Sequence, residues 1–154
     1  MRSGPIRKEP RPGDPIFKSK LVSRVVNLVM QEGKKSVAEG IVYGVIDQLA
    51  EDKKQALELF EGAIKNVMPK TEVRSRRVGG ATYQIPSPVR YDRSEALAVR
   101  WLINAARKKK GKPMEEKLLE EIKNAAQGVG DAIKKRDDVH KMAEANKAFS
   151  HFKF

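Results

Sequence analysis

Hydrophobic residues recur every three or four positions along most of this chain, which is the pattern of amphipathic helices. After Ser19 the pattern predicts three successive helices, with Gly33 ending the first and Pro69 closing the third. Ser36 and Glu39 have the spacing of a capping box, which is expected to open the second helix. The apolar faces of the three helices comprise Leu21, Val22, Val25, Val26, Leu28, Val29, Ile41, Val42, Val45, Ile46, Leu49, Leu57, Phe60, Ile64 and Val67.

The period changes in the next segment, where two short runs favour β-strands. Residues 73–78 and 81–85 are rich in β-branched and aromatic side chains, and Gly79-Gly80 separates them. A Gly-Gly pair adopts the positive φ angles of a two-residue hairpin turn. Two prolines are expected to end the second strand: Pro86 and Pro88. Because a lone hairpin is marginally stable in water, this one should pack on the helices or project as an arm.

Helical spacing returns at Ser94, the expected N-cap of a fourth helix, and continues in a fifth helix over residues 114–127 and a sixth over residues 131–149. The core-facing positions of these helices are Leu97, Trp101, Leu102, Ala105, Leu118, Leu119, Ile122, Val139, Met142, Ala143 and Phe149. The expected fold is therefore mainly α, a single-domain bundle of about six helices with one inserted β-hairpin arm at about residues 72–87.

Residues 1–18 lack this periodicity. They hold four prolines and two glycines, a density that opposes a helix and favours an extended chain. The cations of this Pro-rich tail are Arg2, Arg7, Lys8 and Arg11. The tail is expected either to lie along a phosphate backbone or to be a solvated leader without a role. Residues 19–154 are expected to form the helical domain.

Charge changes the picture more than any other feature of the composition. The chain has 32 Lys and Arg against 20 Asp and Glu, a net charge of +12, which predicts attraction to nucleic acid or to an anionic membrane. The positive charge is concentrated in residues 1–20, 70–93, 100–112 and 134–154. Basic patches on separate elements favour nucleic acid, because a membrane surface selects one basic amphipathic helix.

The predicted hairpin carries Arg74, Arg76 and Arg77 on one strand and Tyr83 on the other. Arginine pairs bidentately with phosphate, and tyrosine stacks on unpaired bases. The alternative is a solvated edge whose charges prevent pairing with another strand. Three arginines in four residues favour contact with RNA.

Other cations lie at predicted helix ends. Lys34 and Lys35 precede the second helix, where cations oppose the helix dipole unless an anion is bound. The run Lys108, Lys109 and Lys110 ends the fourth helix, where cations are favourable without any ligand, so this run is the least specific signal. On the sixth helix, Arg136 and His140 share a face beside the expected core stripe, while Lys134 and Lys141 lie nearly opposite the stripe.

Signals of catalysis are missing from the sequence. It has no P-loop, no GxGxxG, no HExxH and no GxSxG motif. With no cysteine and two histidines, a zinc site or a histidine-based triad is hard to build. No enzyme activity, cofactor, metal or small-molecule substrate is therefore expected. The rival hypotheses are a basic architectural protein that wraps duplex DNA and, less favoured, an RNA-modifying enzyme.

Four runs of residues resemble the bacterial-type small ribosomal subunit protein S-seven family. They are GKKSVA (33–38), RRVGGATYQ (76–84), AVRWL (98–102) and KKRDDVHKMAEANKAF (134–149). The resemblance extends from about Asp14 to the end of the chain, while the N-terminal leader is more Pro-rich and less Arg-dense than the family pattern.

The resemblance implies a helical bundle with an extended hairpin arm that binds the 3′ domain of small-subunit (16S) rRNA and nucleates assembly of the subunit head. It implies an arm near the exit-site tRNA and the mRNA exit path, with head and platform proteins as neighbours, in the cytoplasm. Residues facing rRNA by this resemblance are Lys34, Lys35, Arg76, Arg77, Arg136, His140 and Lys141. The full set of expected RNA-binding residues is Arg2, Arg7, Lys8, Arg11, Lys34, Lys35, Arg74, Arg76, Arg77, Tyr83, Lys108, Lys109, Lys110, Lys134, Lys135, Arg136, His140 and Lys141.

Overall fold

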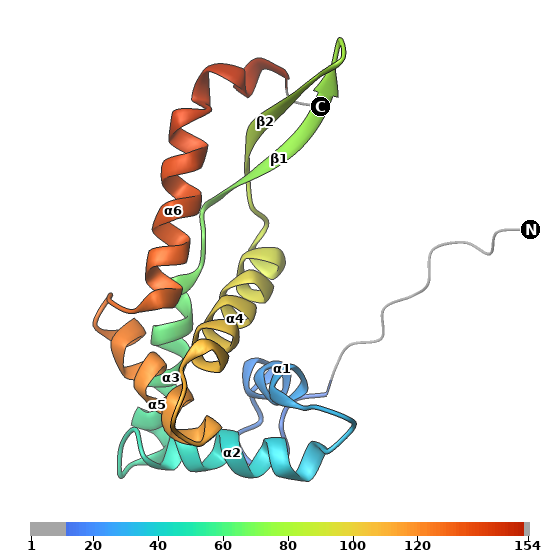
Figure 1. Ribbon diagram of the computed structural model, residues 1–154. Coiled ribbons are helices and arrows are strands. Elements are labelled where there is room, and N and C mark those ends of the chain that lie inside the picture. The colour runs from blue at the N-terminus through green and yellow to red at the C-terminus, as the bar shows by residue number, and fades with distance from the viewer. Residues whose placement is uncertain (1–11, 153–154) are drawn as a thin grey trace, which may run out of the picture.

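The computed structural model describes residues 12–152, with the side chains of Val78 and Phe152 excepted. In this part of the chain six α-helices and one two-stranded antiparallel sheet follow in the predicted order (Figure 1). The elements are α1 (Lys20–Val29), α2 (Lys35–Asp47), α3 (Lys53–Val67), β1 (Thr71–Val78), β2 (Ala81–Pro88), α4 (Tyr91–Lys108), α5 (Met114–Ala126), α6 (Asp131–Ala145) and the 3₁₀ helix η1 (Lys147–Phe152). The mainly α fold with one inserted hairpin is confirmed.

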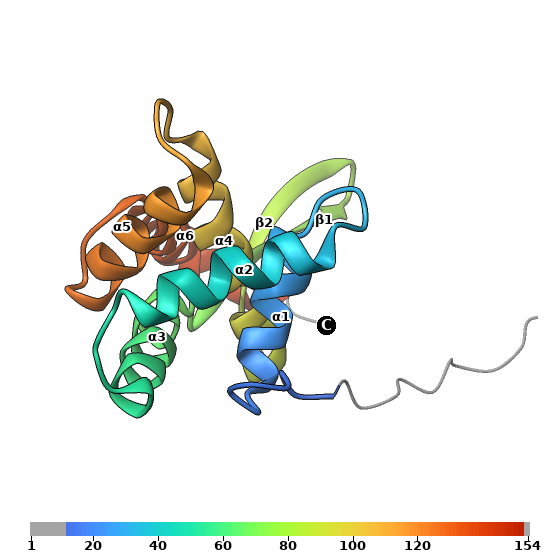
Figure 2. The same ribbon diagram turned by 90° about the horizontal axis from the view of Figure 1, so that it is seen from below.

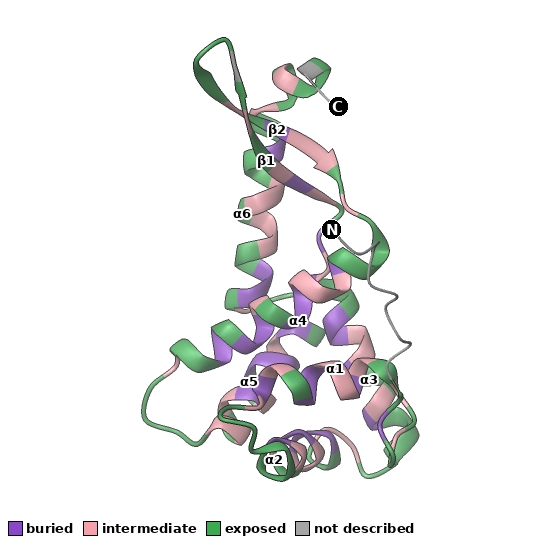
Figure 3. Cartoon of the chain, turned by 90° about the vertical axis from the view of Figure 1, so that its right-hand side faces the viewer, coloured by how far each residue is buried: buried purple, intermediate pink, exposed green. Residues whose placement is uncertain are grey.

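The hydrophobic core lies between the first five helices and the start of α6. Helix α2 lies across one end of the bundle (Figure 2). Phe60 is fully buried, and Ile64, Leu102, Leu118 and Ile122 are at most 1% exposed. Burial of this kind stabilises a fold by about 1.5–3 kcal/mol for each large apolar side chain. The bundle is therefore the rigid part from which the hairpin and the rest of α6 extend (Figure 3).

The hairpin is eight residues long on each strand, and the pair Val78–Ala81 flanks the glycine turn. Gly79 and Gly80 both have positive φ, as the turn prediction requires. The predicted end of the second strand is wrong, because β2 continues through Pro86 to Pro88. A two-stranded ribbon leaves one edge of each strand without a partner, so a proline can face that edge without breaking the ladder.

Three predicted helix starts or stops are also corrected. The first helix ends at Val29, and Gly33, with φ of 76°, lies in the turn that follows. The N-cap of α2 is Lys34 and has no side-chain cap, so the predicted capping box of Ser36 and Glu39 does not form. Helix α4 begins at Tyr91, and the Ser94 hydroxyl instead donates to the carbonyl of Pro69 at 2.7 Å.

The sixth helix is shorter than predicted, because α6 ends at Ala145 and η1 turns back against β2. Its core side is also different: Ala132, Ile133 and Ala143 are buried, whereas Met142 is 47% exposed. The upper half of α6 packs against the hairpin rather than the bundle core, so it does not need a continuous apolar stripe (Figure 1).

Asp14 attaches the segment before α1 to the bundle. Its buried carboxylate accepts hydrogen bonds from the backbone N–H groups of Ile16 and Phe17 and from the Tyr43 hydroxyl at 2.8 Å. Burial, followed by the contact with Asp14, raises the pKa of Tyr43 to about 12. The predicted tail contacts at Arg2, Arg7, Lys8 and Arg11 lie outside the described residues. Within the described range, no helix is both long enough and apolar enough to cross a membrane.

Candidate nucleic-acid interface

The arginines of the hairpin have different surroundings. At its base, Arg74 donates to one oxygen of Glu72 at 2.6 Å, and Arg93 of α4 donates to the other at 2.7 Å. Burial alone would raise the pKa of Glu72, but the hydrogen bonds from Arg93 and Arg74 outweigh it and hold this pKa below its ordinary value. Arg77, nearer the turn, is exposed and makes no hydrogen bond or ion pair with the described residues. Arg93 therefore joins the base of the arm to α4 through Glu72, and Arg74 adds a second bond to the same carboxylate, while Arg77 is available to a ligand.

Tyr83, the predicted base-stacking residue, packs against Phe149 of η1. The two ring centroids are 5.2 Å apart and the rings are tilted by 53°, within the range of favourable aromatic pairs. The ring is half-buried. The C-terminal segment thus covers part of the side chain that the sequence assigned to RNA.

Lys34 and Lys35 lie at the start of α2, as predicted, and are well exposed. Lys34 is 2.7 Å from Glu32, and Lys35 is 3.4 Å from Glu39 one helical turn away. Exposed pairs of this kind contribute at most about 1 kcal/mol. A phosphate group can therefore replace the two glutamates as the partner of these lysines at little cost in free energy.

The basic run at the end of α4 divides into inward and outward side chains. Lys109 points inward and lies 3.0 Å from Glu120 and 3.1 Å from the buried Glu121. Burial alone would lower the pKa of Lys109, but its hydrogen bonds to these two carboxylates raise it above the ordinary value. Lys108 and Lys110 are exposed and have no hydrogen-bond or ion-pair partner in the described part of the chain.

Two of the expected RNA contacts on α6 are engaged with protein. Arg136 donates to the carbonyl of Asn66 and to Asp137, and the Nε2 atom of His140 accepts from the Lys70 N–H at 3.0 Å. These contacts join α6 to the end of α3 and the start of β1. On the same helix Lys134 is 3.6 Å from Asp131, while Lys135 and Lys141 are exposed and unpaired among residues 12–152.

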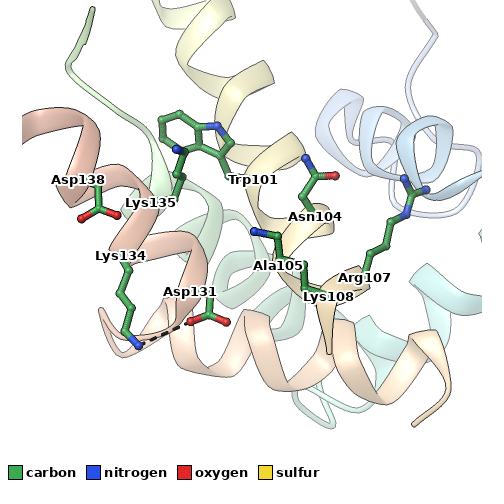
Figure 4. Close-up of a pocket in the computed structure, with 9 residues that line it drawn as sticks. All are labelled: Trp101, Asn104, Ala105, Arg107, Lys108, Asp131, Lys134, Lys135 and Asp138. Carbon is green, nitrogen blue, oxygen red and sulfur yellow. Dashed lines mark ion pairs between the residues drawn. The ribbon is translucent and has the colours of Figure 1, made fainter. Parts of the chain in front are cut away.

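A cleft of about 750 Å³ lies between α4 and α6 (Figure 4). The cleft lining consists of Trp101, Asn104, Ala105, Arg107, Lys108, Asp131, Lys134, Lys135 and Asp138. The structure thus brings together cations that are far apart in the sequence. Trp101 was predicted as a core residue, and its half-buried position in a basic cleft was missed; its neighbours Arg100 and Arg107 on the same helix were the available signal.

A second, smaller groove lies at the start of α2 and shares one lining residue with this cleft. Arg107 lines both, and the second groove also includes Lys34, Val37 and Met114. Arg107 is fixed there because its guanidinium donates to the carbonyl of Leu28 at 3.0 Å. Lys34 at the N-cap of α2 and the cations of α4 and α6 therefore line two grooves that share Arg107, whereas the hairpin stands at the other end of α6 (Figure 1).

Within residues 12–152, no three or more acidic or histidine side chains are grouped in a way that could hold a metal ion. The arrangement offers charge, hydrogen-bond donors and one partly exposed indole. These groups suit binding to a polyanion of irregular shape.

Comparisons with known proteins agree along the whole chain. The family model described as Ribosomal protein S7p/S5e matches residues 1–147. The small ribosomal subunit protein uS7 of Pelotomaculum thermopropionicum is 54% identical over 154 residues, 99% of each chain. That of Fervidobacterium nodosum is 56% identical over 151 residues, 96% of this chain and 97% of the relative. That of Thermotoga maritima is 52% identical over 155 residues and all of both chains.

Proposed function

The chain belongs to the ribosomal protein S7p/S5e family, and from this premise we propose that it binds the 3′ domain of 16S rRNA and nucleates assembly of the small-subunit head. Membership makes it an rRNA-binding protein of the small ribosomal subunit that serves translation. The role is structural, as in the family generally.

One observation carries the proposal: cations of α4, of α6 and at the N-cap of α2 line two grooves that share Arg107. A rigid bundle with charge on several elements can hold several RNA segments at fixed mutual angles. The major groove of A-form RNA is too narrow for side chains, so recognition depends on phosphates, 2′-hydroxyls and unpaired junction bases. The exposed and unpaired lysines at these grooves suit the phosphates.

The hairpin is proposed to serve a separate contact, with exit-site tRNA and the mRNA exit path. Eight residues of extended chain span about 26 Å, so the exposed turn and Arg77 stand well away from the bundle. Glu72 and Ser94 fix the base of the arm to α4 and to the end of α3. Neighbouring proteins of the head and platform are the proposed protein partners.

Chemical footprinting of the full-length protein on small-subunit rRNA tests the proposal. Protection is expected at a multi-helix junction of the 3′ domain and in no other domain. In the same experiment the double variant Lys108→Glu, Lys135→Glu, which reverses two exposed and unpaired charges in the cleft, should weaken the protection. Protection spread evenly over the rRNA would contradict the proposal.

Competition with duplex DNA separates this function from the architectural DNA-binding alternative. The labelled junction fragment should remain bound in the presence of an equal mass of DNA duplex. Displacement by the duplex would favour the alternative.

A further inference from the structure

We propose that the cleft between α4 and α6 holds one unpaired nucleotide of the rRNA, with its base stacked on the indole of Trp101 and its phosphate between Lys108 and Lys135. This inference rests on the proposed function and names the ligand of one part of the interface.

Trp101 is the first reason. It packs against the hydrophobic core and also lines the cleft, so part of its ring is in contact with solvent. Its indole N–H makes no hydrogen bond with any described residue, although a partly buried tryptophan usually finds a partner for this group. A half-buried aromatic surface beside free cations is a stacking platform for bases.

The second reason is the distribution of charge in the cleft. Lys134 is paired with Asp131, and Arg107 donates to the carbonyl of Leu28. Lys108 from α4 and Lys135 from α6 have no such partner among the described residues; Lys135 lies beside the indole, and Lys108 lines the cleft further along α4 (Figure 4). A phosphate between them would neutralise two charges that the protein leaves unpaired.

Size and polarity agree with a single nucleotide. The cleft, of about 750 Å³, falls in the range of about 300–1,000 Å³ typical of small-molecule sites. Asn104 from α4 and Asp138 from α6 also line it, on opposite sides, and add an amide and a carboxylate to its polar lining (Figure 4). An RNA duplex is too wide for this space, so the nucleotide must be unstacked from its neighbours, as in a loop or a junction.

The test uses the fact that Trp101 is the only tryptophan of the chain. The intact protein is titrated with a 3′-domain rRNA fragment that contains the junction, and the fluorescence of Trp101 is recorded with and without iodide. Stacking should quench the emission and shield the indole from iodide. Binding that leaves both signals unchanged would overturn the inference while leaving the proposed function in place.

Variants provide a second readout. Trp101→Leu should weaken RNA binding by about five- to hundredfold, the usual loss for one stacked base, and Trp101→Phe should restore most of it. Lys108→Ala and Lys135→Ala should each weaken binding more than Lys110→Ala, a matched control in the same basic run but outside the cleft lining. Equal effects of all three lysine variants would contradict the site.

Circular dichroism shows whether Trp101→Leu is folded. If it is not, the fluorescence of the unaltered protein and the binding of the lysine variants still test the inference. If the unaltered protein fails to bind the fragment at all, the proposed function fails as well. The two failures are therefore distinguishable.

Discussion

The ammonium group of Lys109 lies 3.1 Å from the Oε2 atom of Glu121, a carboxylate whose side chain is 1% exposed. The other oxygen of Glu121 accepts a hydrogen bond from the backbone N–H of Ala132 at 3.0 Å. One buried carboxylate on α5 thus joins the end of α4 to the first turn of α6. These two helices form the walls of the Trp101 cleft, so the pair fixes the geometry of the candidate site.

Removal of the Lys109 side chain should destabilise the fold. Lys109→Ala leaves the Glu121 charge buried without its ammonium partner, and breaking a fully buried pair costs about 3–5 kcal/mol. Because the Lys109 side chain is 22% exposed, we expect a smaller loss of about 2–3 kcal/mol in the free energy of unfolding. Urea denaturation measures this loss. The free energy of unfolding of Lys110→Ala should stay within about 0.5 kcal/mol of that of the unaltered protein. If Lys109→Ala loses no more stability than Lys110→Ala, Lys109 does not stabilise the fold.

Acid should weaken the anchor of the hairpin. The pKa of Glu72 is lower in the folded protein than its ordinary value of 4.5, so its stabilising contribution is present above that value and is lost as the pH falls through the folded pKa. Glu72→Gln should therefore be less stable than the unaltered protein at pH 7, and the difference should shrink below pH 4.5. Thermal unfolding across this pH range tests the prediction. A constant difference would mean that the charge of Glu72 is not responsible.

The helices and the hairpin were predictable because each follows from short-range pattern. The spacing of Val22, Val25, Val26 and Val29 corresponds to one helix face, and Gly79-Gly80 supplies the backbone of a tight turn. The helix boundaries were not predictable in the same way. Ser94 looks like a helix cap in the sequence, but in the fold its hydroxyl reaches the Pro69 carbonyl, 25 residues away.

The sequence predicted a set of cations for the candidate site, but not which of them bind other protein groups and which face a ligand. Lys108, Lys109 and Lys110 are chemically identical in the sequence, and only the packing of α5 shows that the middle one faces Glu121. The same holds for Arg136, whose guanidinium reaches Asn66 because α6 passes the end of α3. Long-range packing decides which charges face a ligand.

Binding to the rRNA fragment should weaken steeply with salt. A protein that neutralises six to ten phosphates of duplex DNA loses about a thousand- to hundred-thousand-fold in affinity between 50 and 200 mM salt. The slope for junction RNA should be somewhat gentler, since single strands release fewer counterions per phosphate. Fluorescence anisotropy at several salt concentrations measures it. Nearly equal affinity at both ends of the range would contradict an electrostatic interface.

The arginines of the hairpin should separate into two classes on mutation. Arg77→Ala removes an exposed, unpaired cation, so it should weaken RNA binding and reduce the salt slope by about 1 without changing stability. Arg74→Ala also removes a hydrogen bond to the buried Glu72 and should lower the free energy of unfolding by about 1 kcal/mol or more. Paired measurements of binding and denaturation test this. Identical stability of the two variants would show that the bond from Arg74 to Glu72 does not stabilise the base of the arm.

The C-terminal 3₁₀ helix should restrain the arm through the contact between Phe149 and Tyr83. Aromatic pairs with centroids 5.2 Å apart contribute about 0.5–1.5 kcal/mol beyond their buried area. Phe149→Ala should therefore speed hydrogen exchange at the hairpin amides of β2, while the amides of α3 and α5 in the bundle core keep their protection. Phe149→Tyr keeps a ring at this position and is the matched control. Faster exchange throughout the bundle would instead indicate that η1 stabilises the whole fold, because loss of a purely local contact opens only the segment it covers.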